Sequence, residues 1–248
     1  MIDFYGFYGP WPYWNSPHTA PSRMLQLMAK NGIEQAVICH TGAIFDDWDK
    51  ANNEALAAAQ ADHRLIPFVC LNPVISGEQM VAVMKTYKQR GCRGIRLYPQ
   101  HHHYRLSEPV AETMLATAEQ LGLPVVLSVR IIMQWGLPTL DTGEISAAVR
   151  KFPKVQFVLS GTNYGESRWL YELMDSAPNV SAEISAMEGF RAVQEVVARF
   201  GAKRILFGAG TPLQYPACNV AKMNVTQLSA DDREAIASGN ARRLMGLL

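Results

Sequence analysis

Two arginines stand near the ends of apolar runs in this sequence, where they could bind an anion. Arg96 lies in GIRLY, and Arg130 directly follows PVVLSV. A guanidinium at such a place must be paired or must face a wet cavity, and two on neighbouring strands could hold one carboxylate or phosphate in a bidentate manner. The pattern predicts a small anionic, carboxylate-bearing ligand. In the alternative, the arginines pair with Glu183 or Asp3, or point out toward helices.

Two further residues could transfer protons. His40 ends the run QAVICH and Glu183 lies in VSAEIS, so we predict these two as the catalytic residues, with His40 as a general base. The alternative for His40 is a hydrogen-bonded histidine at a strand end. Tyr5, Ser128 and Trp135 complete the predicted substrate-binding set. No nucleophile paired with a base is evident, and the sequence has no Gly-x-Ser-x-Gly elbow.

The run QHHHY, residues 100–104, is a further candidate for metal binding. If this run is extended, His101 and His103 share a side and could bind a metal with His40 or Glu183. The alternative is a solvated loop.

The elements that must position these residues alternate strictly between short apolar runs and amphipathic stretches. Strands are expected at residues 1–5, 35–40, 65–71, 94–98, 124–129, 155–160, 180–185 and 204–209. Helices are expected at residues 22–32, 49–61, 77–91, 109–122, 143–152, 167–177, 190–201 and 229–248. This alternation predicts an α/β protein with a parallel sheet closed into a (β/α)8 TIM barrel, as one domain over residues 1–248. The alternative is a doubly wound open sheet, which usually carries a glycine-rich phosphate loop that this sequence lacks.

Three long connections follow strands, at residues 6–20, 131–140 and 210–227. In a barrel they lie on the C-terminal face, where active sites are built. Their aromatic residues could roof a pocket, or they could plug the top of the barrel.

Several segments in order along the chain resemble the amidohydrolase superfamily, in particular the small amidohydrolase-2 barrels. IDFYGFYG is similar to that family's first strand, Ile-Asp-x-His-x-His-x-Gly. GCRGIRLYP, LGLPVVLSV, FPKVQFVLSG and RILFGAGTP are similar to its fourth, fifth, sixth and eighth strands, and GNARRLMGL to its closing helix. The resemblance implies a metal-dependent hydrolase fold with metal ligands on strands 1, 5, 6 and 8.

Each of those ligand positions carries a different residue in this chain. The resemblance places the metal ligands at Tyr5, Phe7, Ser128, Gly161 and Gly210. Phenylalanine and glycine offer no side-chain ligand, and tyrosine and serine hydroxyls are poor zinc ligands at neutral pH. We therefore expect no metal, no cofactor and no metal-dependent hydrolysis. Either the barrel binds or regulates as a pseudoenzyme, or it is a metal-independent hydrolase such as a lactonase.

Composition excludes several classes of partner. The chain has 248 residues, 48% of them hydrophobic, and a formal net charge of +1. This charge gives no electrostatic reason to bind nucleic acid or an anionic membrane. The four cysteines form no CxxC pair, which favours reduced thiols in a cytoplasmic protein. We expect a small-molecule ligand, and homo-oligomers are common among barrels of this kind.

Overall fold

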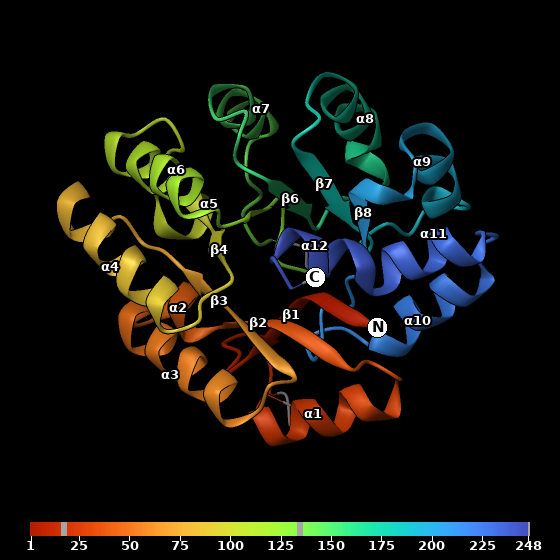
Figure 1. Cartoon of the computed structure of the whole chain (residues 1–248), viewed down its shortest axis with the longest axis horizontal. Helices are drawn as coiled ribbons and strands as arrows, with labels where there is room; N and C mark the ends of the chain where they lie inside the picture. Colours follow the sequence, from red (N-terminus) through yellow and green to blue (C-terminus); the bar gives the residue numbers. More distant parts are fainter. Residues whose placement is uncertain (16–18, 133–135, 248) are drawn as a thin grey trace.

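The computed structural model describes residues 1–15, 19–132 and 136–247 of the chain (Figure 1). Its sheet runs in the order β1 to β8, and each strand is parallel to the next. The strands are β1 (Ile2–Tyr8), β2 (Gln35–His40), β3 (Leu65–Cys70), β4 (Gly94–Leu97), β5 (Val125–Ser128), β6 (Phe157–Ser160), β7 (Val180–Glu183) and β8 (Ile205–Leu206). Each predicted strand is present with different ends, and β8 has only two residues of the predicted range 204–209.

Backbone hydrogen bonds connect the last strand region to the first. The Phe4 amide donates to the Phe207 carbonyl at 2.9 Å, and the Phe7 amide donates to the Thr211 carbonyl at 2.7 Å. Helices surround the strands in an outer ring (Figure 1). The prediction of a (β/α)8 TIM barrel is confirmed.

The helices mostly follow the predicted pattern. They are α1 (Pro21–Lys30), α2 (Gly42–Phe45), α3 (Trp48–Ala61), α4 (Gly77–Gln89), α5 (Pro99–His102), α6 (Pro109–Leu121), α7 (Thr142–Lys151), α8 (Ser167–Ser176), α9 (Ala192–Phe200), α10 (Pro216–Val225), α11 (Ala230–Glu234) and α12 (Asn240–Leu244), with the short turns η1 (Tyr164–Glu166), η2 (Ala202–Arg204) and η3 (Ala235–Gly239). The Ser229 side chain caps α11 and accepts from the Asp232 amide at 3.1 Å. None of these helices is long and apolar enough to cross a membrane.

One predicted loop is wrong, because α10 lies inside residues 210–227. Pro216 stands in its first turn, where proline needs no amide partner. Its buried face carries Asn219 beside Met223, so the helix lacks the apolar periodicity that marks a helix in sequence.

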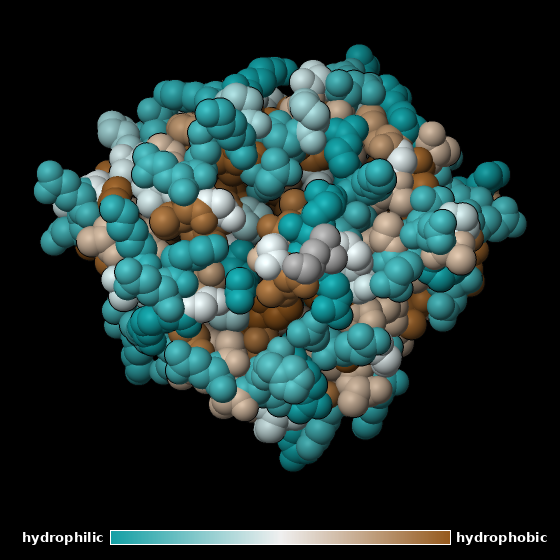
Figure 2. All heavy atoms as spheres, viewed as in Figure 1, coloured by the Kyte–Doolittle hydropathy of each residue, from teal (hydrophilic) through white to brown (hydrophobic). Residues whose placement is uncertain are grey.

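Two apolar clusters hold the barrel together. The larger packs the outer faces of the strands against the helices. The second fills the barrel interior, where Phe4 and Leu206 meet Leu244 and Met245 from the C-terminal region. Figure 2, in the same view as Figure 1, shows hydrophobic residues near the centre of this face and hydrophilic ones over much of the surrounding rim.

A bulge in β1 decides which side chains enter the barrel. The register between β1 and β2 shifts between Asp3 and Gly6, so strict alternation of side chains fails there. Phe4, Tyr5 and Phe7 therefore all belong to the interior cluster. The Asp3 carboxylate accepts the Tyr5 amide at 2.9 Å, and it also accepts the Ala209 amide at 2.8 Å. One buried side chain thus stabilises the bulge and ties β1 to the segment after β8.

Candidate functional site

Hydroxyl groups form a hydrogen-bonded chain across the barrel interior. The Tyr5 hydroxyl lies 3.1 Å from Ser128 Oγ and 3.3 Å from the Arg130 carbonyl, and Ser128 Oγ lies 2.8 Å from Ser160 Oγ. Burial raises the pKa of Tyr5 to about 12. Tyr5 therefore stays protonated at neutral pH and offers a neutral hydroxyl, not a phenolate.

The backbone at two of the replaced ligand positions also departs from what a metal site needs. Gly161 has φ of +67° and Gly210 has φ of +64°, a region that L side chains rarely adopt. A Cβ at Gly161 would lie 2.1 Å from the Arg130 carbonyl oxygen. A side chain at Gly161 therefore requires the backbone to move. In the part of the chain that the structure describes, no group of three or more His, Cys, Asp or Glu residues could hold a metal ion. The donor set here does not fit the family's metal.

Arg96 is the largest fully buried side chain at this site, with 0% exposure. Its Nη2 donates to the Val37 carbonyl at 3.0 Å and to the Phe4 carbonyl at 3.4 Å. Its guanidinium carbon lies 5.0 Å and 4.8 Å from the ring centres of Tyr5 and Phe7. These contacts orient the cation, but none supplies a negative charge.

The other two nitrogens of the Arg96 guanidinium donate no hydrogen bond to the described residues. Nε and Nη1 have no hydrogen-bond partner there, and no carboxylate forms an ion pair with this guanidinium. The Tyr98 hydroxyl lies beside the guanidinium, and the two groups interact electrostatically. Arginine stays charged in proteins, so the barrel holds a buried cation that no carboxylate among the described residues pairs with.

Two thiols lie near this cation. Cys70 on β3 is in register with Arg96 on β4. A hydrogen bond with Cys70 holds the pKa of Cys39 below its usual value despite burial, and the charge on Arg96 adds to this effect. Sequence reasoning expected only reduced thiols and placed neither cysteine at the site. Their positions on the inward side of β2 and β3 were the available signal.

Glu183 shares the barrel interior and accepts three hydrogen bonds. Its Oε1 accepts the Gly161 amide at 3.1 Å and the Ser185 hydroxyl at 2.7 Å, and its Oε2 accepts the Ser185 amide at 2.6 Å. Burial raises the pKa of Glu183, against these hydrogen bonds. A Cβ at position 208 would lie 1.9 Å from Oε2, which explains the glycine there. The structure thus places Glu183 in the same interior as Tyr5, and its catalytic role stays a prediction.

Arg130 differs from Arg96 because it has an ionic partner. Its Nη1 and Nη2 donate to the two oxygens of Glu166, each at 2.7 Å. Partial burial by itself raises the pKa of Glu166. The hydrogen bonds from Arg130 outweigh this effect and lower the pKa below its usual value. The predicted alternative partners, Glu183 and Asp3, are not the ones used. Sequence reasoning missed Glu166, which lies beyond β6 on η1.

His40 lies away from this interior. Its Nδ1 accepts the Gly42 amide at 2.9 Å, and its Nε2 lies 3.2 Å from Glu54 Oε2. Burial lowers the pKa of His40. The ring lines a cavity of about 320 Å³ together with Pro10 and Phe45. The structure therefore does not bring the two predicted catalytic residues, His40 and Glu183, together. Trp135 lies outside the described residues.

The three consecutive histidines do not form an extended run. Residues Pro99–His102 form helix α5, and His103 has φ of +53°. His101 packs edge-on against Phe45 and Tyr98, with ring centres 5.6 Å and 6.1 Å away. Among the residues described, no metal-binding group includes them. Burial lowers the pKa of His101 to about 4.

This pKa predicts a loss of stability in acid. A free histidine has a pKa of 6.5, so between pH 6.5 and about 4 the folded state binds fewer protons at His101 than the unfolded state. The resulting stability is complete above pH 6.5 and is lost as the pH falls toward 4. His101→Phe keeps an aromatic ring there and removes the titration. Denaturant unfolding at pH 7 and pH 4 should show about 1–2 kcal/mol less acid destabilisation in the variant, after discounting for partial exposure. Equal losses in both proteins would contradict the packing described for His101.

Comparison with known families decides the ancestry of this barrel. The model of the family described as Amidohydrolase matches residues 15–247. The chain belongs to the amidohydrolase family. The amidohydrolase match begins after β1, the strand that carries the bulge, Tyr5 and Phe7. No protein of curated function matches the chain.

Solved structures share this amidohydrolase fold at low sequence identity. A 5-carboxyvanillate decarboxylase from Sphingomonas paucimobilis is 15% identical with a TM-score of 0.74, covering 90% of this chain and 82% of its own. A 2,6-dihydroxybenzoate decarboxylase from Rhizobium is 16% identical with a TM-score of 0.74, covering 99% and 98%. A dihydroxybenzoic acid decarboxylase from Polaromonas sp. JS666, with bound manganese and 2-nitroresorcinol, is 14% identical with a TM-score of 0.78, covering 99% and 96%. At these identities the likeness shows the fold alone.

Proposed function

We propose that this amidohydrolase-family barrel binds a small carboxylate-bearing molecule at the C-terminal end of its strands, without metal-dependent hydrolysis. The observation that carries the proposal is the guanidinium of Arg96, which pairs with no carboxylate of the described residues and is buried among Tyr5, Phe7 and Tyr98. Residues at the family's ligand positions offer hydroxyls, a phenyl ring and bare backbone in place of metal ligands.

Electrostatics favour an anion beside Arg96. An isolated cation in a protein interior costs several kcal/mol unless an opposite charge and hydrogen bonds compensate it. Nε and Nη1 of Arg96 carry N–H groups that no described residue accepts. A bound carboxylate would compensate the charge and accept from one of these nitrogens, while the hydroxyls of Tyr5, Ser128 and Tyr98 would contact its polar substituents.

Two observations support a proposed type of ligand, namely the side chains around Arg96 and the names of proteins with this fold. Aromatic and hydroxyl groups around Arg96 suit a hydroxylated aromatic acid. Several proteins with this fold are named for such acids, 5-carboxyvanillate and 2,6-dihydroxybenzoate. We assign Arg96 the main charge contact and Arg130 a weaker one, because Glu166 already neutralises Arg130. Trp135 stays part of the proposed binding set.

Metal-independent hydrolysis is a second candidate, favoured by one observation. Glu183 is a buried carboxylate whose pKa is raised by that burial, and a raised pKa suits a general base near neutral pH. In this case Arg96 would hold the substrate carboxylate while Glu183 takes a proton from water. His40 does not suit the role of general base here, because its ring lies outside the barrel interior beside Glu54.

A thermal-shift titration tests the binding proposal. The probes are benzoate, salicylate and 2,6-dihydroxybenzoate, each compared with its neutral amide. We expect at least one carboxylate to raise the melting temperature in a saturable way, since a ligand at 100 times its Kd adds about 2.7 kcal/mol to stability. The matched amide lacks the charge and should have little effect. Equal shifts with acid and amide, or no shift with any acid, would reject the proposal.

A further inference from the structure

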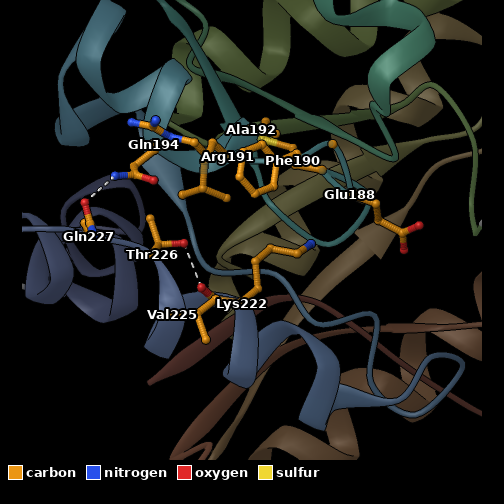
Figure 3. Close-up of a pocket in the computed structure, with 12 residues that line it drawn as sticks. Glu188, Phe190, Arg191, Ala192, Gln194, Lys222, Val225, Thr226 and Gln227 are labelled. Carbon is orange, nitrogen blue, oxygen red and sulfur yellow. Dashed lines mark hydrogen bonds between the residues drawn. The ribbon is translucent and has the colours of Figure 1, made fainter.

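A separate cavity of about 510 Å³ lies between the β7–α9 connection and α10. Its volume is typical of small-molecule sites. Met187, Phe190 and Arg191 line it from the connection, and Lys222 and Val225 line it from α10. Figure 3 shows the Phe190 ring on one side, with the Lys222 side chain reaching toward it from the other. The residues around Arg96 take no part in this cavity.

Hydrogen bonds hold the Lys222 amine in a defined orientation. Its Nζ donates to the Ile184 carbonyl and to Asn219 Oδ1, each at 2.8 Å. An ammonium has three N–H donors, whereas a neutral amine has two and a lone pair. The neutral amine can therefore keep both hydrogen bonds and leave its lone pair free for a molecule in the cavity.

The charges around Lys222 come from three elements. Burial lowers the pKa of Lys222, while Glu183 on β7, Glu188 on the following connection and Cys218 on α10 act in the opposite direction. Burial outweighs these charges, so the pKa of Lys222 is lowered. The neutral fraction of its amine near pH 7 is therefore larger than that of an exposed lysine. Neutral lysines in apolar surroundings are the ones that attack carbonyl groups.

Apolar side chains define the kind of molecule that fits. Phe190 is 93% exposed and Val225 is 79% exposed, although both line the cavity. An aromatic ring stacked on Phe190 would cover this surface. Gln194 and Gln227, hydrogen-bonded at 3.3 Å, join α9 to the segment after α10 at the edge of the cavity.

We propose that Lys222 is a nucleophilic lysine that forms a reversible imine with a small aldehyde or ketone carrying an aromatic group. The amine nitrogen attacks the carbonyl carbon, and the addition product then loses water to form the C=N bond. The two amine protons leave with the carbonyl oxygen as that water. The imine gains a proton from solvent, and its single N–H can still donate to Ile184 or Asn219.

Reductive trapping tests this assignment on the intact protein. The probe is pyridoxal, an aromatic aldehyde, with cyanoborohydride at pH 7, followed by peptide mass spectrometry. Lys85 on α4 is the internal reference, because it is exposed. Because the lowered pKa leaves more of the Lys222 amine neutral, Lys222 should label several-fold faster than Lys85. Labelling of Lys222 at or below the rate of Lys85 would overturn the proposal.

A second variant tests the aromatic preference. Phe190→Ala removes an exposed ring and should leave the fold intact. We expect it to slow trapping of pyridoxal at Lys222 several-fold while trapping of formaldehyde stays unchanged. If both probes label this variant as fast as the wild type, the cavity does not recognise an aromatic group through Phe190.

Discussion

Arg96→Met is expected to abolish carboxylate binding without destabilising the ligand-free protein. Methionine fills much of the same volume but carries no charge. Losing one partner of a buried charge pair costs about 2 kcal/mol or more, so affinity should fall at least about 30-fold. In the ligand-free protein the same change removes an unpaired buried cation. Replacing buried ionic groups by apolar ones is often neutral or stabilising, so the unfolding free energy should stay within about 1 kcal/mol or rise.

Arg204→Met is the matched control for this experiment. The Arg204 guanidinium also donates to two backbone carbonyls, those of Met174 and Ala177 at 2.9 and 3.2 Å, and it lies 5.3 Å from the Phe200 ring. It belongs to the outer layer of the barrel, so this variant should bind carboxylates like the wild type. Calorimetric titration and denaturant unfolding of both variants are the measurements. Normal binding by Arg96→Met would remove Arg96 from the site.

Gly161→Ala should strongly destabilise the barrel. Position 161 has φ of +67°, which costs an L residue about 1–2 kcal/mol. The added Cβ would also lie 2.1 Å from the Arg130 carbonyl oxygen, and such overpacking typically costs a further 1–3 kcal/mol or so. We expect a total loss of about 3 kcal/mol in unfolding free energy. Gly161→His, which restores the family's ligand type, should be destabilised at least as much.

Gly32→Ala separates the two causes. Gly32 has the same φ of +67°, but a Cβ there meets nothing within 4 Å. The Gly32→Ala variant should therefore lose about 1 kcal/mol of unfolding free energy, from the backbone conformation alone. The difference between the two variants measures the contact with Arg130. If both variants lose the same amount, the backbone directly after strand β6 can accept a side chain at position 161, and a metal ligand fits there.

The sequence was informative about the barrel because its strands are buried on both faces and separated by helical patterns. Each apolar run became a strand, and Ser229 begins a helix as its side chain predicts. Helix α10 was missed because Asn219 occupies its buried face. The bulge in β1 has no signal in the apolar pattern, and it alone places both Phe4 and Tyr5 inside the barrel.

The site was only partly predictable, for a geometric reason. Arg96 could be predicted as a site residue because it is a charged residue inside an apolar strand. His40 was predicted as a catalytic residue because it ends a strand. Side chains alternate along a strand, however, so the position alone does not decide whether His40 points into the barrel. Cys39 points into the barrel, so His40 points toward α3 and Glu54. The partner of Arg130 depends on how the segment after β6 turns back, which residue types alone do not specify.

The most direct test of the account is whether carboxylate binding needs a metal. The carboxylate that stabilises the protein most is titrated calorimetrically into chelator-treated protein and into protein supplied with manganese. The account predicts the same Kd in both samples and no stoichiometric manganese retained after dialysis. Binding that appears only with manganese, together with one retained ion per chain, would contradict it.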